Sequence, residues 1–475
     1  MTDVPRKFRN NGSIFQKNRL ENSIKVARKL FILNSLPVHA EVICMGLKPS
    51  GYLPRLTDSI IERRMKAFGA VEVAGPKFCG KTWSSMAQAA SIAHLDDAGT
   101  RRMAELDVSL ALEGQLPHVI DEWQDVPTVW DAVRRSVDEH GNKRGMYLLT
   151  GSSTVDKSKV SHSGAGRIAT VPMRTMSLFE SGESTGAVSL RGLFEGQFVG
   201  GVASTDVRKL AYAICRGGWP AALEGDDELV GDIAAQYLDA LFSVNAVKAG
   251  LDSRMARRCA SSLARNMGTS LTYRTMYADL HEGVVPSGVA ASYFQSELEP
   301  YVSFFEDQYF IENQVGWDAP IKSKSRIRSK PKRTFTDPSL PASLLGMSPE
   351  RLLRETQTFG TLFEELCLRD VRVYSSALGT MPNPIVSYYG DADGLEVDIV
   401  VELPDGRWGA FEVKLSEEKV PAAEANLLRL RDKIARNPAA RNADPSFLAV
   451  LVGKASYTWK MPSGVYVIPI TELGA

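Results

Sequence analysis

A short segment near the start of the chain has the residue types and spacing that bind phosphate. Residues 75–82 read GPKFCGKT, and they lie between an apolar run, 71–74, and a segment, 83–90, that we expect to be helical. Two glycines let successive N–H groups and the helix N-terminus face an anion. This strand–loop–helix context favours an ATP site over a ligand-free glycine-rich turn. The predicted nucleotide contacts are Gly75, Pro76, Lys77, Phe78, Cys79, Gly80, Lys81, Thr82 and Trp83.

Later residues supply the partners that phosphate chemistry needs. We expect Lys81 to reach the β- and γ-phosphates and the Thr82 hydroxyl to hold Mg²⁺. The apolar strand 118–122 ends in Asp121, a second Mg²⁺ ligand, and Glu122, which would orient and deprotonate the attacking water. Another apolar strand, 146–150, leads to Ser152, which we expect to sense the γ-phosphate. The order of these motifs predicts an ATPase that uses ATP and Mg²⁺.

A second group of chemically suitable residues lies near the C-terminus. Asp398 lies on the predicted strand 396–402, and Glu412 and Lys414 lie on its predicted hairpin partner, 408–414. Residues two apart project from one face of a strand. Asp398 and Glu412 are then expected to chelate Mg²⁺, Lys414 to stabilise charge, and Glu364 to approach from a helix over 359–374. This pattern is typical of a restriction-endonuclease-like core; the alternative is an edge hairpin with solvent-facing charges.

The hairpin register decides whether that cluster forms. A two-residue turn at 405–406 sets Asp398 opposite Val413, which places Asp398 and Glu412 on opposite faces. A three-residue loop at 405–407 pairs Asp398 with Lys414 and brings all three groups to one face. We therefore predict a loop with an odd number of residues, or a bulge that restores the parity.

The elements between the two groups suggest a nucleic-acid contact. Residues 196–335 read as mostly helical, with helices over 230–244, 254–267, 271–280 and 286–298, a strand over 309–317 and a basic loop. This order is the outline of a winged helix-turn-helix, whose wing would contact DNA phosphates. The alternative is a solvated hairpin tip. The predicted DNA contacts are Lys322, Lys324, Arg326, Arg328, Lys330, Lys332 and Arg333.

Composition limits the remaining function classes. The 475 residues include 56 Lys and Arg and 56 Asp and Glu, so the net charge is zero and any nucleic-acid site must be local. Five scattered cysteines without a CxxC pair disfavour a disulfide framework or a zinc ribbon. The most apolar early stretch, 30–47, contains Asn34, His39 and Glu41, so we expect neither a membrane span nor a signal peptide. A cytoplasmic location follows as an expectation.

Together these residues resemble a prokaryotic family of AAA-type P-loop ATPases fused to a C-terminal domain of unknown function with a PD-(D/E)xK, restriction-endonuclease-like core. The resemblance implies a homo-oligomer as one option. Arg167, which follows a loop rich in Ser, Gly and Lys, would stabilise charge on the γ-phosphate in cis or from a neighbouring subunit. The matching segments are 52–56, 75–82, 120–122, 149–153, 165–167, 176–180, 217–220, 336–340, 359–364, 396–398 and 412–414.

The predicted fold class is therefore α/β and multidomain. The expected order is an N-terminal extension (1–50), a parallel α/β ATPase core (51–195), a helical lid (196–245), a winged-helix-like domain (246–335) and a restriction-endonuclease-like domain (336–475). One hypothesis is an ATPase that binds DNA and cuts or remodels it. The other is an ATP-dependent switch whose C-terminal fold only docks a partner. Metal-dependent DNA cleavage distinguishes them.

Overall fold

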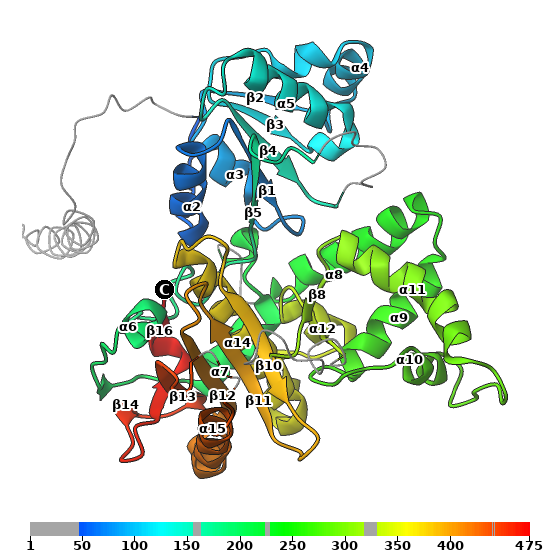
Figure 1. Ribbon diagram of the computed structural model, residues 1–475. Helices are drawn as coiled ribbons and strands as arrows, with labels where there is room; N and C mark the ends of the chain where they lie inside the picture. Colours follow the sequence, from blue (N-terminus) through cyan, green and yellow to red (C-terminus); the bar gives the residue numbers. More distant parts are fainter. Residues whose placement is uncertain (1–46, 155–162, 224–228, 318–329, 439, 441) are drawn as a thin grey trace, which may run out of the picture. The chain divides into compact units, whose positions relative to one another are not determined.

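The computed structural model (Figure 1) describes most of the chain after the predicted N-terminal extension. Lys322, Lys324, Arg326 and Arg328 lie outside the described residues, as do positions 1–46 of the extension. No helix in the described part of the chain is both long and apolar enough to cross a membrane. The described residues are 47–154, 163–223, 229–317, 330–438, 440 and 442–475.

The first sheet has five strands in the order β2-β3-β4-β1-β5, and all its pairings are parallel. Parallel neighbours require crossover connections, and helices lie in the connections from β1 to β2, from β2 to β3 and from β3 to β4. The predicted parallel α/β core is confirmed. Its strands are β1 (Ala70–Ala74), β2 (Ser91–His94), β3 (His118–Asp121), β4 (Tyr147–Gly151) and β5 (Ile168–Pro172).

Alternate residues of these strands bury against opposite layers of helices. Ile120 and Leu149 belong to one apolar cluster with Val133 of α5, whereas Val71 belongs to another with Ile61 of α2. Both faces are covered, which explains why the strands read as continuous apolar runs. The helices around this sheet are α2 (Leu56–Met65), α3 (Lys81–Met86), α4 (Ala98–Leu106) and α5 (Thr128–Glu139).

The middle of the chain is mainly helical, as expected, with two differences. The helix predicted over 286–298 begins after Gly288, whose φ is +75°, and continues beyond Leu298 because Val302 and Phe305 are buried in the core. The antiparallel pair β8–β9 begins its second strand inside the predicted basic loop, at Lys332. The elements are β6 (Val188–Ser189), α6 (Leu190–Phe194), β7 (Gly201–Val202), α7 (Val207–Arg216), α8 (Asp232–Ala240), a π-helical turn (Leu241–Ala246), α9 (Ser253–Arg265), α10 (Tyr273–Leu280), α11 (Ala291–Asp307), β8 (Ile311–Gln314) and β9 (Lys332–Phe335).

A second, mixed sheet forms the C-terminal part. Its order is β10-β11-β12-β13-β15-β14-β7, antiparallel from β10 to β12 and parallel from β12 through β13 to β15. Phe411 of β12 buries in the cluster that contains α14, and its neighbour Ala410 buries in the cluster that contains α15. The elements are α12 (Ser339–Leu344), α13 (Pro349–Arg354), α14 (Thr356–Ala377), β10 (Ile385–Gly390), β11 (Glu396–Glu402), β12 (Trp408–Ser416), α15 (Val420–Ala435), β13 (Phe447–Lys454), β14 (Tyr457–Lys460), β15 (Tyr466–Pro469) and β16 (Leu473–Gly474).

One hydrophobic core joins regions that the sequence predicted to be separate domains. Ile214 of α7, Phe305 of α11 and Leu366 of α14 belong to the same buried cluster. Backbone pairing adds to this, because β7 pairs with β14 and β6 pairs with β16. The lid, the middle helices and the C-terminal sheet are therefore packed on one another through apolar contacts.

Candidate functional site

The phosphate loop follows the carboxyl end of β1 and leads directly into α3. Gly80 has a φ of +104°, a left-handed conformation that glycine adopts without steric cost. At Gly75 a side chain would clash, because a Cβ atom would lie 2.0 Å from the Met173 carbonyl oxygen after β5. Both glycines of the motif are therefore required by local geometry.

The loop's lysine is buried and held by the loop itself. Lys81 is 4% exposed, and its Nζ donates to the Pro76 carbonyl at 2.8 Å. Lys77 is only partly buried, and Phe78 and Trp83 are exposed. Lys81 is thus an internal cation at the point where the motif predicts the β- and γ-phosphates.

Hydroxyl and carboxylate oxygens meet beside the loop. Thr82 Oγ1 donates to Asp121 Oδ1 at 2.8 Å, and the Thr150 hydroxyl donates to the same oxygen. Asp121 is 5% exposed at the end of β3. Hard oxygen donors of this kind are the ligands that Mg²⁺ prefers, so Thr82 and Asp121 fit the predicted Mg²⁺ of a bound nucleotide.

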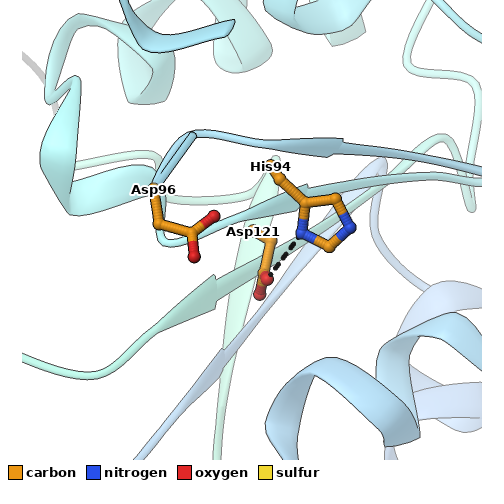
Figure 2. A group of neighbouring side chains, drawn as sticks. All are labelled: His94, Asp96 and Asp121. Atoms are coloured by element: carbon orange, nitrogen blue, oxygen red, sulfur yellow. Dashed lines mark hydrogen bonds and ion pairs between the residues drawn. The ribbon is translucent and has the colours of Figure 1, made fainter. Parts of the chain in front are cut away.

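A histidine that the sequence did not single out faces the other oxygen of Asp121. Its Nδ1 atom lies 3.2 Å from Asp121 Oδ2, and Asp96 lies close by (Figure 2). This residue, His94, ends β2, which pairs in parallel with β3 so that His94 lies opposite Asp121. Strand order, which the sequence did not reveal, brings the two side chains together.

Glu122 leaves the strand that was predicted to contain it. Its φ of 53° ends β3 at Asp121, and its N–H donates to Thr150 Oγ1 at 3.2 Å. The carboxylate oxygen Oε2 accepts hydrogen bonds from Ser152 Oγ at 2.7 Å and from the Gln124 amide nitrogen. The predicted base, Glu122, and the predicted sensor, Ser152, are therefore hydrogen-bonded to each other. Gln124 is a third member that the sequence did not indicate.

A buried arginine supports the loop from below. Arg55 is 6% exposed and donates to the Cys79 carbonyl at 2.6 Å and to the Arg174 carbonyl at 2.8 Å. Its Nε also lies 3.1 Å from Glu180. From the sequence, Arg55 was only part of segment 52–56, which resembles the ATPase family. Its role in positioning the loop is seen in the structure alone.

Aromatic residues of the predicted lid contact the loop. The rings of Phe78 and Tyr237 meet edge to face at a centroid distance of 6.3 Å, and Tyr237 stacks on the buried Trp219 at 5.2 Å. Pro220 lies next to Gly80. The segment 217–220 is therefore packed against the phosphate loop.

Arg167 does not reach this site from its own chain. Its carbonyl accepts a hydrogen bond from Ala70, the first residue of β1, whereas the phosphate loop follows the last. Five strand residues separate the two edges of the sheet by roughly 15 Å. The guanidinium also lies 2.7 Å from Asp138. The expected role in cis is therefore corrected, and the role from a neighbouring subunit stays a prediction.

The C-terminal cluster has the predicted face but a different register. Ile399 pairs with Phe411 and Val401 with Gly409, and Leu403 N–H donates to Arg407 across a three-residue loop, 404–406. The pairing is thus two residues out of the predicted one, which keeps the odd parity. Asp398, Glu412 and Lys414 project from one side of the sheet, as predicted.

Lys414 lies between the two carboxylates. Its Nζ is 2.5 Å from Glu412 Oε2 and 3.2 Å from Asp398 Oδ2, and the Val413 N–H donates to Asp398 at 2.8 Å. Asn426 of α15 adds a hydrogen bond of 3.2 Å to Glu412. Asn426 is a member that the sequence did not indicate.

Burial and mutual repulsion disfavour simultaneous ionisation of the carboxyl groups in this cluster. Burial and the nearby charge of Asp398 raise the pKa of Glu412 to about 7 and that of Glu364, on α14, to about 8. The charges of Asp398 and Glu412 raise the pKa of Lys414, although burial opposes them. A divalent cation would relieve this repulsion, and the carboxylate donors fit Mg²⁺ or Mn²⁺.

Only some of the described residues of the predicted basic loop are exposed to solvent. Lys330 is exposed, and Arg333 lies over the Tyr273 ring at 5.1 Å. Lys332 is 4% exposed and forms an ion pair with Glu396 of β11. Since β9 turns this residue inward, the prediction that Lys332 contacts DNA is corrected.

Three family models match successive parts of the chain. Residues 68–181 match an AAA domain, residues 207–351 a domain of unknown function (DUF8612) and residues 359–473 another domain of unknown function (DUF4143). No curated protein matches the chain. The models do not describe a nuclease, so the restriction-endonuclease-like fold stays a proposal.

Solved structures give weak similarities. The Walker-type ATPase paby2304 of Pyrococcus abyssi is 10% identical and covers 64% of this chain and 99% of its own, with a TM-score of 0.38. A RuvB variant of Thermotoga maritima is 18% identical and covers 55% and 88%, with a TM-score of 0.26. The replication initiator DnaA bound to AMPPCP and single-stranded DNA is 12% identical and covers 56% and 94%, also with a TM-score of 0.26. These scores are too low to define a shared fold. The phosphate loop, its Thr82–Asp121 pair and the family match together identify an AAA-type P-loop ATPase domain in this chain.

Proposed function

We propose that this chain is an ATPase that binds DNA and carries a metal-dependent nuclease centre in its C-terminal domain. The observation that carries the nuclease proposal is the convergence of Asp398, Glu412 and Lys414 on one side of the β11–β12 hairpin. Hydrolysis of a phosphodiester needs groups that hold a cation and a group that stabilises negative charge, and the cluster offers both.

In the ATPase domain each residue has a distinct task. Lys81 would bind the β- and γ-phosphates, and Thr82 and Asp121 would hold Mg²⁺, whose charge would offset that of the phosphates. Glu122 accepts a proton from the attacking water. Its hydrogen bonds to Ser152 and Gln124 fix the orientation of its carboxylate.

In the C-terminal cluster the tasks are divided in the same way. Asp398 and Glu412 would hold a divalent cation, and such an ion, when bound, would supply Lewis-acid chemistry to the phosphate. Lys414 leaves its ion pairs to stabilise the negative charge that develops on the phosphate oxygens. Glu364, whose raised pKa of about 8 favours its protonated form at pH 7, would supply a proton to the leaving oxygen, and the attacking water would release its proton to solvent.

One observation favours a second candidate, a binding module without cleavage. Glu412 is only 1% exposed, and Lys414 already forms ion pairs with both carboxylates. A cluster closed in this way would stabilise the fold while the domain docks a partner. Nuclease-like folds can keep such geometry without activity.

Cleavage of supercoiled plasmid DNA with Mg²⁺ or Mn²⁺ separates the two candidates. The nuclease proposal predicts nicking by the full chain and its loss in Asp398→Asn. Asp405→Asn is a matched control, because Asp405 lies on the exposed loop of the same hairpin and pairs with Arg407. Binding of DNA without cleavage, in either metal, would leave the binding module as the function.

The DNA proposal rests on the helices and the β8–β9 pair that precede the cluster. On α9, Arg254, Arg257 and Arg265 are exposed on a helix that carries no acidic residue. Phosphate contacts of this type give affinity without sequence choice. Neutralising Lys322, Lys324, Arg326, Arg328 and Lys330 should weaken DNA binding equally for all sequences and flatten its salt dependence, as measured by fluorescence anisotropy. Unchanged affinity and salt slope would show that these residues do not contact DNA.

A further inference from the structure

Asp121 presents its two oxygens to different surroundings. Oδ1 accepts hydrogen bonds from the hydroxyls of Thr82 and Thr150, whereas Oδ2 faces the imidazole of His94. Among the described residues, this buried carboxylate has no ion pair with a lysine or arginine. Buried charges in proteins are paired or bind metals, so the Oδ2 side is a place where a cation is expected.

Strand geometry completes a set of ligands on that side. His94 ends β2 directly opposite Asp121 of β3, and Asp96 follows two residues later at the same carboxyl edge of the sheet. One ligand atom from each of the three residues lies within 4.8 Å of the others (Figure 2). His94 and Asp96 are exposed, so an ion can enter from solvent and complete its coordination with water.

We propose that His94, Asp96 and Asp121 bind a transition-metal ion such as Mn²⁺, Co²⁺ or Zn²⁺, at a site distinct from the Mg²⁺ of the nucleotide. An imidazole nitrogen with two carboxylates suits such ions, whereas Mg²⁺ prefers oxygen ligands alone. The two cations share Asp121, one at each oxygen. The site is beyond the nucleotide motif, because two of its three ligands lie on or just after β2.

Sharing one carboxylate links the two binding events. Two cations close to Asp121 repel each other and divide its negative charge, so each weakens the binding of the other. By thermodynamic reciprocity the factor is the same in both directions. The bound transition metal would therefore lower the affinity for Mg²⁺ and ATP and restrain the ATPase.

The direct test titrates the nucleotide-free full-length protein with Co²⁺ and follows the visible absorption of the bound ion, in excess Mg²⁺. We expect saturable binding with one ion per chain at this site. His94→Ala should weaken it on the order of 10- to 100-fold, since even outer-shell changes have effects of this size. Asp96→Asn should weaken it as well. His140→Ala is the matched control, because His140 follows α5 and its ring hydrogen-bonds to the carbonyl of Ser136 in that helix.

Equal Co²⁺ affinity in His94→Ala and the unchanged protein would overturn the proposal, as would complete displacement of Co²⁺ by Mg²⁺. His94→Gln removes the imidazole with a side chain of similar length and replaces His94→Ala if that variant fails to fold. Since the titration contains no nucleotide, its failure would not bear on ATP hydrolysis. A loss of ATP turnover with normal Co²⁺ binding would affect only the proposed function.

Discussion

The phosphate site and the C-terminal cluster both contain buried carboxylates suited to a metal ion, but the negative charge is compensated differently in the two sites. In the phosphate site, Lys81 and Thr82 lie next to each other in sequence, and neutral hydroxyls hold the one buried carboxylate, Asp121. In the cluster, Asp398 and Glu412 come from different strands and depend on the cation of Lys414. The first site joins a loop to a weakly neutralised carboxylate 39 residues away, whereas the second joins coupled charges across a single hairpin, where Asp398 and Lys414 are 16 residues apart.

The two sites should therefore respond differently to substitutions and to changes in packing. The left-handed turn of the phosphate loop follows from Gly80 itself, whereas Gly75 and Arg55 tie the loop to more distant segments. The cluster depends on the pairing of β11 with β12, where a shift of one residue would move Asp398 to the other face. The catalytic consequences of substitution should therefore be specific in the first site and combined with stability effects in the second.

The largest expected effect comes from Glu122→Gln. It should lower kcat for ATP about 10²- to 10⁴-fold, because the water loses its base, while ATP binding persists through Lys81 and Asp121. Steady-state turnover and nucleotide-binding titrations measure the two effects separately. Gln124→Ala should show a smaller loss of the same kind. Normal turnover by Glu122→Gln would remove the base assignment.

Lys81→Ala should weaken ATP binding roughly 10- to 150-fold, because a hydrogen bond to a charged group contributes about 1.5 to 3 kcal/mol. Equilibrium titration with a fluorescent ATP analogue gives the dissociation constant. Lys66→Ala, an exposed lysine that forms an ion pair with Glu62 of α2, is the control. Since the cluster is formed by other residues, Mg²⁺ or Mn²⁺ binding at Asp398 should not change. Equal losses in both lysine variants would contradict the role of Lys81.

The coupled charges of the cluster predict that the stability of the protein depends on pH. The folded-state pKa values of Glu412 and Glu364, about 7 and 8, lie above the ordinary value of 4.5. The folded protein then holds more protons than the unfolded chain, so this contribution to stability is complete below pH 4.5 and is lost as pH rises through 7 and 8.

Thermal unfolding between pH 5 and pH 9 measures this effect. The Tm should fall toward pH 9, and Mg²⁺ should reduce the fall because it neutralises the ionised carboxylates. Glu364→Gln should flatten the curve, whereas Glu402→Gln on the same strand β11 as Asp398 should not. A curve that is identical in Glu364→Gln and the unchanged protein would exclude the coupling.

The smallest effect is expected for Arg167→Ala. Its partly exposed ion pair with Asp138 contributes only about 0–1 kcal/mol, and the distance from the phosphate loop leaves turnover in dilute protein unchanged. A loss of turnover that appears only at high protein concentration would show a role in a neighbouring subunit. Turnover that is reduced at every concentration would show that Arg167 acts within its own chain.

Sequence by itself determined the features that depend on near neighbours. The motif at 75–82, the apolar strands and the two-residue spacing of Glu412 and Lys414 each follow from local backbone geometry. They predicted the parallel sheet, the phosphate loop and the shared face of the cluster. The hairpin parity was also accessible, because only a loop with an odd number of residues or a bulge can bring Asp398 and Glu412 together.

Tertiary structure decided the features that depend on which strands become neighbours. The order β2-β3 brings His94 to Asp121, and the β8–β9 pair turns Lys332 inward to Glu396. The start of β5 places Arg167 at the edge of the sheet opposite the phosphate loop. None of these follows from local periodicity, because strand order and pairing are selected by burial of the whole core, where charged side chains must find partners or remain in water.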